Sequence, residues 1–300
     1  MADIIKYQTM EKFLGINNVD NSTRLVPLII NHEYVYSLQQ ANNMDIDNTY
    51  GLSSRSGYSG ILSGLDIHSL SDDAPGFFVD DDTLKKLNID YSVISLRSGL
   101  TSGARMSYTP FNNRIYYTNG YEIGYIQSIV DYPLVDPALE FKLPLPAGQF
   151  IEYFMSCLYV AVGKKLYISD PLCDYYDVRT GYRIFNEQIT MLRAVDDGLY
   201  VSDDRIWFVK GKGNEDFERI EVYSHRAISY TDVRINSQDM NNEMKGNMVI
   251  WTGENGICIG NNDGVVVNLT ESRYTFTPTN QGAGFIRSEN NVRHYINSLY

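Results

Sequence analysis

Residues Arg114 to Ile126 read RIYYTNGYEIGYI, and this stretch decides the fold class. Two runs of β-forming residues flank Asn119-Gly120, the pair that a tight type I′ hairpin turn requires at positive φ. Three later stretches repeat the design with glycine or aspartate in the turn: LYVAVGKKLYI from Leu158, LYVSDDRIWFV from Leu199 and VIWTGENGICI from Val249. The chain therefore contains a repeated β-hairpin.

The repeat has a regular spacing. The first apolar residue of each hairpin is Ile115, Leu158, Leu199 or Val249, and His294 fits the same column. The intervals are 43, 41, 50 and 45 residues. A period in the forties with about four short strands per unit is typical of β-propeller blades and not of βαβ units. We therefore predict an all-β propeller of five blades, with six blades as the alternative.

The two ends of the chain are expected to close this propeller. The last repeat stops at Tyr300 before its hairpin can return, so one blade lacks an outer strand. An open strand edge is an aggregation hazard, and the segment from Leu52 to Leu62 is the candidate to pair with it. In the six-bladed alternative, Gly57 to Leu70 supplies a weakly marked extra blade.

Outside the repeats the chain divides into two parts. Residues 1–50 lack blade punctuation and are predicted to form an N-terminal arm, with a short helix from Glu33 to Met44. Residues 51–300 are predicted to form the propeller. Within it, residues 71–90 contain SDDAP and VDDD, which indicate an exposed acidic insertion between blades.

Composition limits the classes of function. The formal net charge of −12 argues against a surface that grips nucleic acid, because such surfaces cluster Lys and Arg. An acidic wall that faces DNA would instead repel it and let it slide. No apolar window is long enough for a membrane span, and a signal peptide is not expected. The three widely spaced cysteines, Cys157, Cys173 and Cys258, indicate buried thiols made in a reducing cytoplasm.

The sequence predicts no catalytic, cofactor or metal site. The segment from Asp45 to Ser56 departs from a calcium loop at its sixth and twelfth positions, and the four histidines lack zinc-ligand spacing. Paired carboxylates could serve a glycoside hydrolase. The candidates lie in turns, where Asp and Asn are favoured for local backbone bonding: Asp196, Asp197, Asp203, Asp204, Glu254 and Asp263.

An ordered motif occupies residues 14–60. It reads LGINNVDNSTRL from Leu14 and LQQANNMDIDNTYGLSSRSGYSG from Leu38. This arrangement resembles a family of bacteriophage and prophage structural proteins with the pattern GINN, then A-x-N-x-D-I-D-N-x-G-x-L-x-x-R-x-GY. One departure is an extra residue, Tyr50, before Gly51. The matching residues are Gly15, Ile16, Asn17, Asn18, Ala41, Asn43, Asp45, Asp47, Asn48, Gly51, Leu52, Arg55, Gly57 and Tyr58.

The resemblance extends over almost the whole chain and is weaker between residues 65 and 105. The chain is similar to the propeller-bearing hub or nozzle proteins of short-tailed phages. The resemblance implies a non-enzymatic virion protein, assembled in the host cytoplasm as a homo-oligomeric ring around the DNA conduit. The implied partners are copies of itself, the portal or adaptor, and other tail proteins; DNA would pass without specific binding.

The motif makes physical sense without an enzyme. Asp45, Asp47 and Asn48 are expected to build a turn, and Gly51 allows a conformation that other residues resist. Arg55 places a guanidinium group with several hydrogen-bond donors on a strand, and Tyr58 places an amphipathic ring on the same strand. Two other classes remain open: a carbohydrate-binding propeller at the tail tip that recognises host glycan through aromatic residues, and a glycoside hydrolase.

Overall fold

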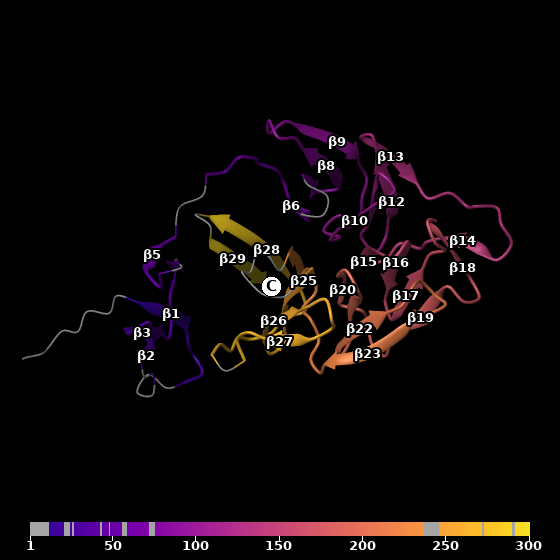
Figure 1. The fold of residues 1–300 in the computed structure, drawn as a ribbon. Coiled ribbons are helices and arrows are strands. Elements are labelled where there is room, and N and C mark those ends of the chain that lie inside the picture. The colour runs from indigo at the N-terminus through magenta and orange to yellow at the C-terminus, as the bar shows by residue number, and fades with distance from the viewer. Residues whose placement is uncertain are drawn as a thin grey trace, which may run out of the picture.

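The computed structural model describes residues 12–20, 25, 27–42, 44–47, 49–55, 59–71, 76–236, 246–271, 273–289 and 292–300. Within these ranges every regular element is a β-strand and none is a helix, which confirms the all-β prediction (Figure 1). Asn43, Asn48, Gly57 and Tyr58 of the predicted motif lie outside the described residues.

Five antiparallel sheets of four strands follow one another along the described part of the chain, and we number them as blades 1 to 5. Blade 1 contains β6 (Ile67–His68), β7 (Phe77–Asp80), β8 (Thr83–Leu87) and β9 (Val93–Arg97). Blade 2 contains β10 (Ser107–Phe111), β11 (Arg114–Thr118), β12 (Ile123–Gln127) and β13 (Val130–Pro133). Blade 3 contains β15 (Phe150–Phe154), β16 (Cys157–Val162), β17 (Lys165–Ile168) and β19 (Tyr182–Ile184).

Blade 4 contains β20 (Met191–Ala194), β21 (Leu199–Ser202), β22 (Ile206–Lys210) and β23 (Glu218–Tyr223). Blade 5 contains β24 (Val233–Asn236), β25 (Asn247–Gly253), β26 (Gly256–Gly260) and β27 (Val266–Asn268). A short pair, β14 (Lys142–Pro144) and β18 (Tyr175–Asp177), extends beside blade 3. Figure 1 shows the blades following one another around a common centre, with their first strands nearest to it.

The four hairpins predicted from the sequence are present as β11–β12, β16–β17, β21–β22 and β25–β26. The first turn differs in detail from the expected type. The last strand pair is Thr118 with Ile123, so four residues form the loop, and only Gly120 has positive φ, at 93°. Asn119 instead accepts hydrogen bonds from the backbone N–H groups of Tyr121 and Glu122, which shapes the loop.

Apolar cores fill the spaces between consecutive blades. Tyr117 lies in the cluster between blades 1 and 2, and its neighbour Tyr116 lies in the cluster between blades 2 and 3. Tyr159 lies between blades 3 and 4, and Trp251 between blades 4 and 5. These four side chains are at most 1% exposed. Because successive strand residues point to opposite faces, each sheet contributes to two cores.

The two ends of the chain form smaller sheets. The N-terminal strands are β1 (Phe13–Ile16), β2 (Leu28–Ile30) and β3 (Glu33–Leu38) in one sheet, and β4 (Met44–Ile46) with β5 (Leu52–Ser54) in another. The C-terminal strands β28 (Gly282–Glu289) and β29 (Val292–Leu299) form a hairpin. Ile286 and Tyr295 of this hairpin pack against blade 5.

The expected pairing between Leu52–Leu62 and the C-terminal strand is not present in the described residues. β5 pairs with β4, and β29 pairs with β28. The cause is local, because a turn centred on Asp47 folds β5 back onto β4. Among the described residues the two ends therefore do not share a sheet.

Two further expectations are corrected. Residues 76–90, the larger described part of the predicted acidic insertion, belong to a blade instead: β7 and β8 lie within blade 1, and Phe78 and Val79 are at most 2% exposed. Asp81 and Asp82 occupy the hairpin turn between β7 and β8, where Asp81 has φ of 58°. The segment Glu33–Met44 contains a strand instead of a helix, because Val35 is buried while Tyr34 is 59% exposed, which is the alternation of a strand.

Candidate functional site

Asp45 connects the two ends of the chain. Its Oδ1 accepts a hydrogen bond from Arg55 Nε at 3.2 Å, and its Oδ2 accepts one from Arg287 Nη2 at 2.6 Å. Arg55 follows β5, whereas Arg287 lies on β28, 242 residues from Asp45. The side chains of Asp45, Arg55 and Arg287 are 15%, 34% and 11% exposed. We call these three residues the clasp.

The clasp holds its carboxylate ionised. Burial opposes the charge on Asp45, but hydrogen bonds from Arg287 and Arg55 outweigh burial and lower the pKa of Asp45 below its usual value. Arg287 also contacts Nδ1 of His294, its cross-strand partner on β29, at 3.2 Å. Hydrogen bonds between ionised partners are stronger than neutral ones. The clasp therefore ties the N-terminal strand pair to the C-terminal hairpin.

Asp47 builds the turn that presents the clasp. Its Oδ1 accepts hydrogen bonds from Thr49 N at 2.8 Å, Thr49 Oγ1 at 2.6 Å and Gly51 N at 2.9 Å. The additional residue, Tyr50, has φ of 64° and lengthens the turn. A Cβ on Gly51 would lie 3.0 Å from Asp47 Oδ2, so glycine allows this close approach. The turn sets the register that brings Arg55 beside Asp45.

Asn18 makes a second connection between the ends of the chain. Its N–H donates to the carbonyl oxygen of Arg273 at 2.9 Å. Its side-chain Nδ2 donates to the carbonyl oxygen of Thr275 at 2.9 Å, and its Oδ1 accepts from Thr275 N at 2.8 Å. An asparagine side chain thus binds an extended backbone as a neighbouring strand would.

The described residues of the predicted motif fall into two groups. Gly15, with φ of 121°, and Asn17, whose Oδ1 accepts from Val19 N and Asp20 N, shape their own loop. Asp47 and Gly51 also act locally, whereas Asn18, Asp45 and Arg55 join separate parts of the chain. Arg287 is not among the residues predicted from the sequence, because its stretch GAGFIRSENN gives no sign of a partner so distant in sequence.

Charged side chains from the first strands of several blades meet near the centre of the propeller. Arg193 on β20 contacts Asp232 Oδ2 through Nε at 2.7 Å and Glu152 Oε2 through Nη1 at 3.7 Å. Arg234 on β24 contacts Glu152 Oε1 at 3.0 Å. Thr109 on β10 donates to the same oxygen at 3.3 Å. We call Glu152, Arg193, Asp232 and Arg234 the axial network.

The carboxylates of the axial network are deeply buried, its arginines are partly exposed, and its charges balance. The side chains of Glu152 and Asp232 are 3% and 6% exposed, and two guanidinium groups compensate their two charges. A buried carboxylate that lost these partners would be strongly destabilising. Because the network reaches from β15 to β24, and Thr109 adds β10, it fixes the relative positions of blades 2 to 5.

Two of the acidic residues that were candidates for a glycoside hydrolase lie in turns. Asp203 Oδ1 accepts hydrogen bonds from Arg205 N at 3.2 Å and from Trp207 Nε1 at 2.8 Å. Asp196 Oδ2 accepts one from Asn247 N at 2.9 Å, which connects blades 4 and 5. The turn interpretation is confirmed for Asp203, which bonds groups two and four residues away, whereas Asp196 makes a contact between two blades.

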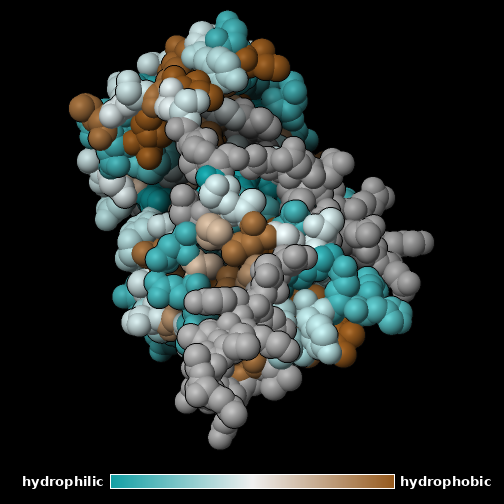
Figure 2. All heavy atoms as spheres, turned by 90° about the vertical axis from the view of Figure 1, so that its left-hand side faces the viewer, coloured by the Kyte–Doolittle hydropathy of each residue, from teal (hydrophilic) through white to brown (hydrophobic). Residues whose placement is uncertain are grey.

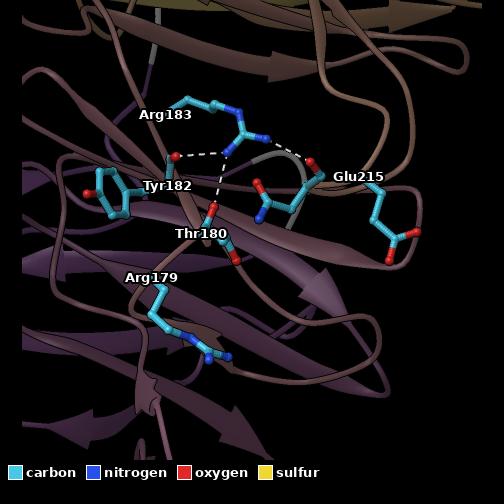
Figure 3. Close-up of a pocket in the computed structure, with 6 residues that line it drawn as sticks. Arg179, Thr180, Tyr182, Arg183 and Glu215 are labelled. Atoms are coloured by element: carbon cyan, nitrogen blue, oxygen red, sulfur yellow. Dashed lines mark hydrogen bonds between the residues drawn. The ribbon is translucent and has the colours of Figure 1, made fainter.

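A surface pocket of about 550 Å³ lies between the β18–β19 loop and the β22–β23 loop. Arg183 spans it, donating to the carbonyl oxygens of Thr180 and Tyr182 at 3.0 Å and of Asn214 at 2.7 Å (Figure 3). The side chain of Arg179, which also lines the pocket, forms two hydrogen bonds with Asp177. The pocket is lined by Arg179, Thr180, Tyr182, Arg183, Asn214 and Glu215.

Among the residues that the structure describes, no group of three or more His, Cys, Asp or Glu side chains could hold a metal ion. In that part of the chain no helix is long and apolar enough to cross a membrane.

Comparison with known family models and with curated proteins finds no match. Similar solved structures include virginiamycin B lyase from Staphylococcus aureus, at 12% identity and a TM-score of 0.43, covering 77% of this chain and 78% of that one. BBS1N in complex with ARL6DN has 10% identity, a TM-score of 0.46 and coverage of 75% and 74%. The WD40 β-propeller domain of Doa1 has 10% identity, a TM-score of 0.41 and coverage of 75% and 72%. Such similarities assign neither an activity nor a partner to this chain.

Proposed function

We propose that this chain is a non-enzymatic structural protein of a bacteriophage particle, a tail hub or head-to-tail component that forms a homo-oligomeric ring around the DNA conduit. The observation that carries the proposal is the clasp. Asp45 and Arg55 belong to the motif that resembles the phage family, and both act in joining the N-terminal strands to the C-terminal hairpin. Because these motif residues hold two parts of the fold together, the motif supports a structural role for the protein.

We extend the proposal to the blade count. Five complete blades are accompanied by the two-stranded hairpin β28–β29, which packs on blade 5 through Ile286 and Tyr295. This hairpin occupies a sixth, incomplete blade position. Tyr300, which follows the hairpin, accepts a hydrogen bond from Arg105 between blades 1 and 2, and no backbone ladder joins the hairpin to blade 1 among the described residues.

The surface supports a role in assembly. Apolar side chains at blade 1 and the segment before it are exposed, with Leu65 89%, Leu70 69% and Ile89 fully accessible. Figure 2 shows hydrophobic residues gathered at the top of the molecule, where blade 1 lies in Figure 1. Exposed apolar patches mark protein contacts. The net charge of −12 suits a wall along which DNA slides without binding.

The proposal is tested by mass spectrometry of purified particles made by the genome that encodes this chain. We expect the chain in a fixed stoichiometry of several copies per particle. A matched genome carrying Asp45→Asn should give particles depleted of the chain, while Asp90→Asn, an exposed turn substitution in blade 1, should not. Purified particles that lack the unaltered chain would contradict the proposal.

A carbohydrate-binding propeller is the second candidate, and the pocket in Figure 3 favours it. Arginine, asparagine, glutamate and tyrosine side chains line this pocket, and together they offer donors, acceptors and one ring for a sugar. A glycan array with purified protein tests it. Repeated binding of one glycan class, lost in Tyr182→Ala and retained in Tyr121→Ala, would favour this candidate over the structural one.

A further inference from the structure

Arg183 is held in a fixed orientation in the pocket between the β18–β19 and β22–β23 loops. It lies on β19, and its Nη1 donates to the carbonyl oxygens of Thr180 and Tyr182, each at 3.0 Å. Its Nη2 donates to the carbonyl oxygen of Asn214 at 2.7 Å. The guanidinium carbon also lies 5.1 Å from the centroid of the Phe217 ring, which is within cation–π range. These contacts place the guanidinium before any ligand binds.

The charge and part of the hydrogen-bonding capacity of Arg183 remain unused in the described part of the chain. A guanidinium has five N–H donors, and the three carbonyl groups take three of them. Nε and the second N–H of Nη2 have no hydrogen-bond partner among the described residues, and no described carboxylate forms an ion pair with Arg183. Figure 3 shows Nε on the side of the guanidinium that faces away from the carbonyl groups of Thr180 and Tyr182. Carboxylate and phosphate groups fit such a planar set of donors.

The other charged residues that line the pocket do not neutralise Arg183. The side chain of Arg179 lines the pocket too, but it bonds both carboxylate oxygens of Asp177. Glu215 carries the one carboxylate among the lining residues, and Figure 3 shows this carboxylate directed away from Arg183. The uncompensated charge of the pocket is therefore that of Arg183, which favours a negatively charged ligand.

We propose that this pocket binds an anionic sugar and that Arg183 receives its carboxylate or phosphate group. The inference rests on the carbohydrate-binding candidate for the same pocket and names the class of sugar. A volume of about 550 Å³ is typical of sites for small ligands. Around Arg183, the side chains of Thr180, Asn214 and Glu215 offer donors and acceptors for hydroxyl groups. Because the fold already holds the guanidinium, binding immobilises little additional side-chain freedom.

A glycan array with the purified full-length chain tests the inference and separates its failure from that of the candidate function. The array pairs neutral glycans with counterparts that carry a uronic acid or a phosphate. We expect binding to acidic members and not to their neutral counterparts, and the two acidic arms identify the preferred anion. Equal binding to the neutral counterparts would overturn the anion assignment and leave carbohydrate binding in place. Binding to no glycan would contradict both.

Substitution places the anion at Arg183. Arg183→Gln should weaken binding of the acidic glycans at least about tenfold, because a charge-assisted contact is lost. Arg219→Gln is the matched control, since Arg219 also donates to a carbonyl oxygen, that of Ile184, and lies outside the pocket lining. Undiminished affinity in Arg183→Gln would overturn the proposal.

NMR spectroscopy of the unaltered chain gives a second readout that does not depend on the folding of a variant. The resonance of the Arg183 Nε–H, assigned by its absence in Arg183→Lys, should shift on addition of sodium glucuronate or glucose 6-phosphate and should not shift with glucose. A resonance that moves with neither anionic sugar would refute the role of Arg183.

Discussion

Asp45→Asn should loosen the N-terminal strands while leaving the blades intact. The substitution keeps the size of the side chain but removes its charge and replaces one acceptor oxygen by a donor. Arg287 donates to Asp45 at 2.6 Å and is 11% exposed, so it would lose a partner that water replaces poorly. Arg55 donates at 3.2 Å and is 34% exposed, so solvent compensates it more easily.

The magnitude follows from these two contacts. A hydrogen bond to a charged partner contributes about 1.5–3 kcal/mol, and a largely exposed ion pair contributes about 0–1 kcal/mol. We expect a loss of about 2 kcal/mol, dominated by Arg287. At roughly 1.4 kcal/mol per factor of ten, local opening should become about 30-fold more frequent.

Hydrogen exchange measured by mass spectrometry tests this prediction. Peptides that cover β4 and β5 should exchange about 30-fold faster in Asp45→Asn, and peptides of blade 4 should not change. Asp90→Asn is the matched control, because Asp90 accepts only from Ser92 N and Oγ in a surface turn. An unchanged rate in β4 and β5, or an equal increase in blade 4, would refute the role assigned to the clasp.

Three further outcomes are expected. Glu152→Ala should lower the free energy of unfolding by about 3–5 kcal/mol, because it removes the buried carboxylate that contacts both Arg193 and Arg234 and leaves the network with an excess positive charge. Glu187→Ala, in an exposed ion pair, should cost at most about 1 kcal/mol in the same denaturant titration. The pKa of Asp45 is depressed in the folded state, so its contribution is complete above the unfolded value of 3.8 and is lost as the pH falls through the lower folded pKa. As the pH falls below 3.8, the rate of proteolysis should rise because this contribution is lost in the unaltered chain, and Asp45→Asn should show no such loss. Asn18→Ala removes both side-chain bonds to Thr275 and should increase cleavage near residues 273–279 by about tenfold; an unchanged cleavage rate would contradict that role.

The repeated hairpins could be predicted because their causes are local. Apolar runs on either side of Gly120 or Gly163 specify two strands and a turn within about a dozen residues. The fixed interval between hairpins then predicts sheets in series. The same reasoning failed at residues 71–90, where Asp81 and Asp82 were interpreted as an insertion although they form the turn of a buried hairpin.

The candidate site could be predicted only in part. Asp45 and Arg55 belong to a recognisable motif, and Asp47 is a typical turn residue, so their stretch of sequence stands out. Arg287 completes the clasp from the opposite end of the chain, and no local pattern specifies a contact 242 residues away. The predicted pairing of the two chain ends is wrong for a related reason. The turn at Asp47 pairs β5 with the neighbouring strand β4, so β5 does not pair with the C-terminal strand.

Cryo-electron microscopy of particles made by the genome that encodes this chain tests the central claim most directly. The account predicts a symmetric ring of this fold at the tail or the head-to-tail junction. Density for the fold at peripheral fibres, or its absence from particles that contain all other tail proteins, would contradict the account.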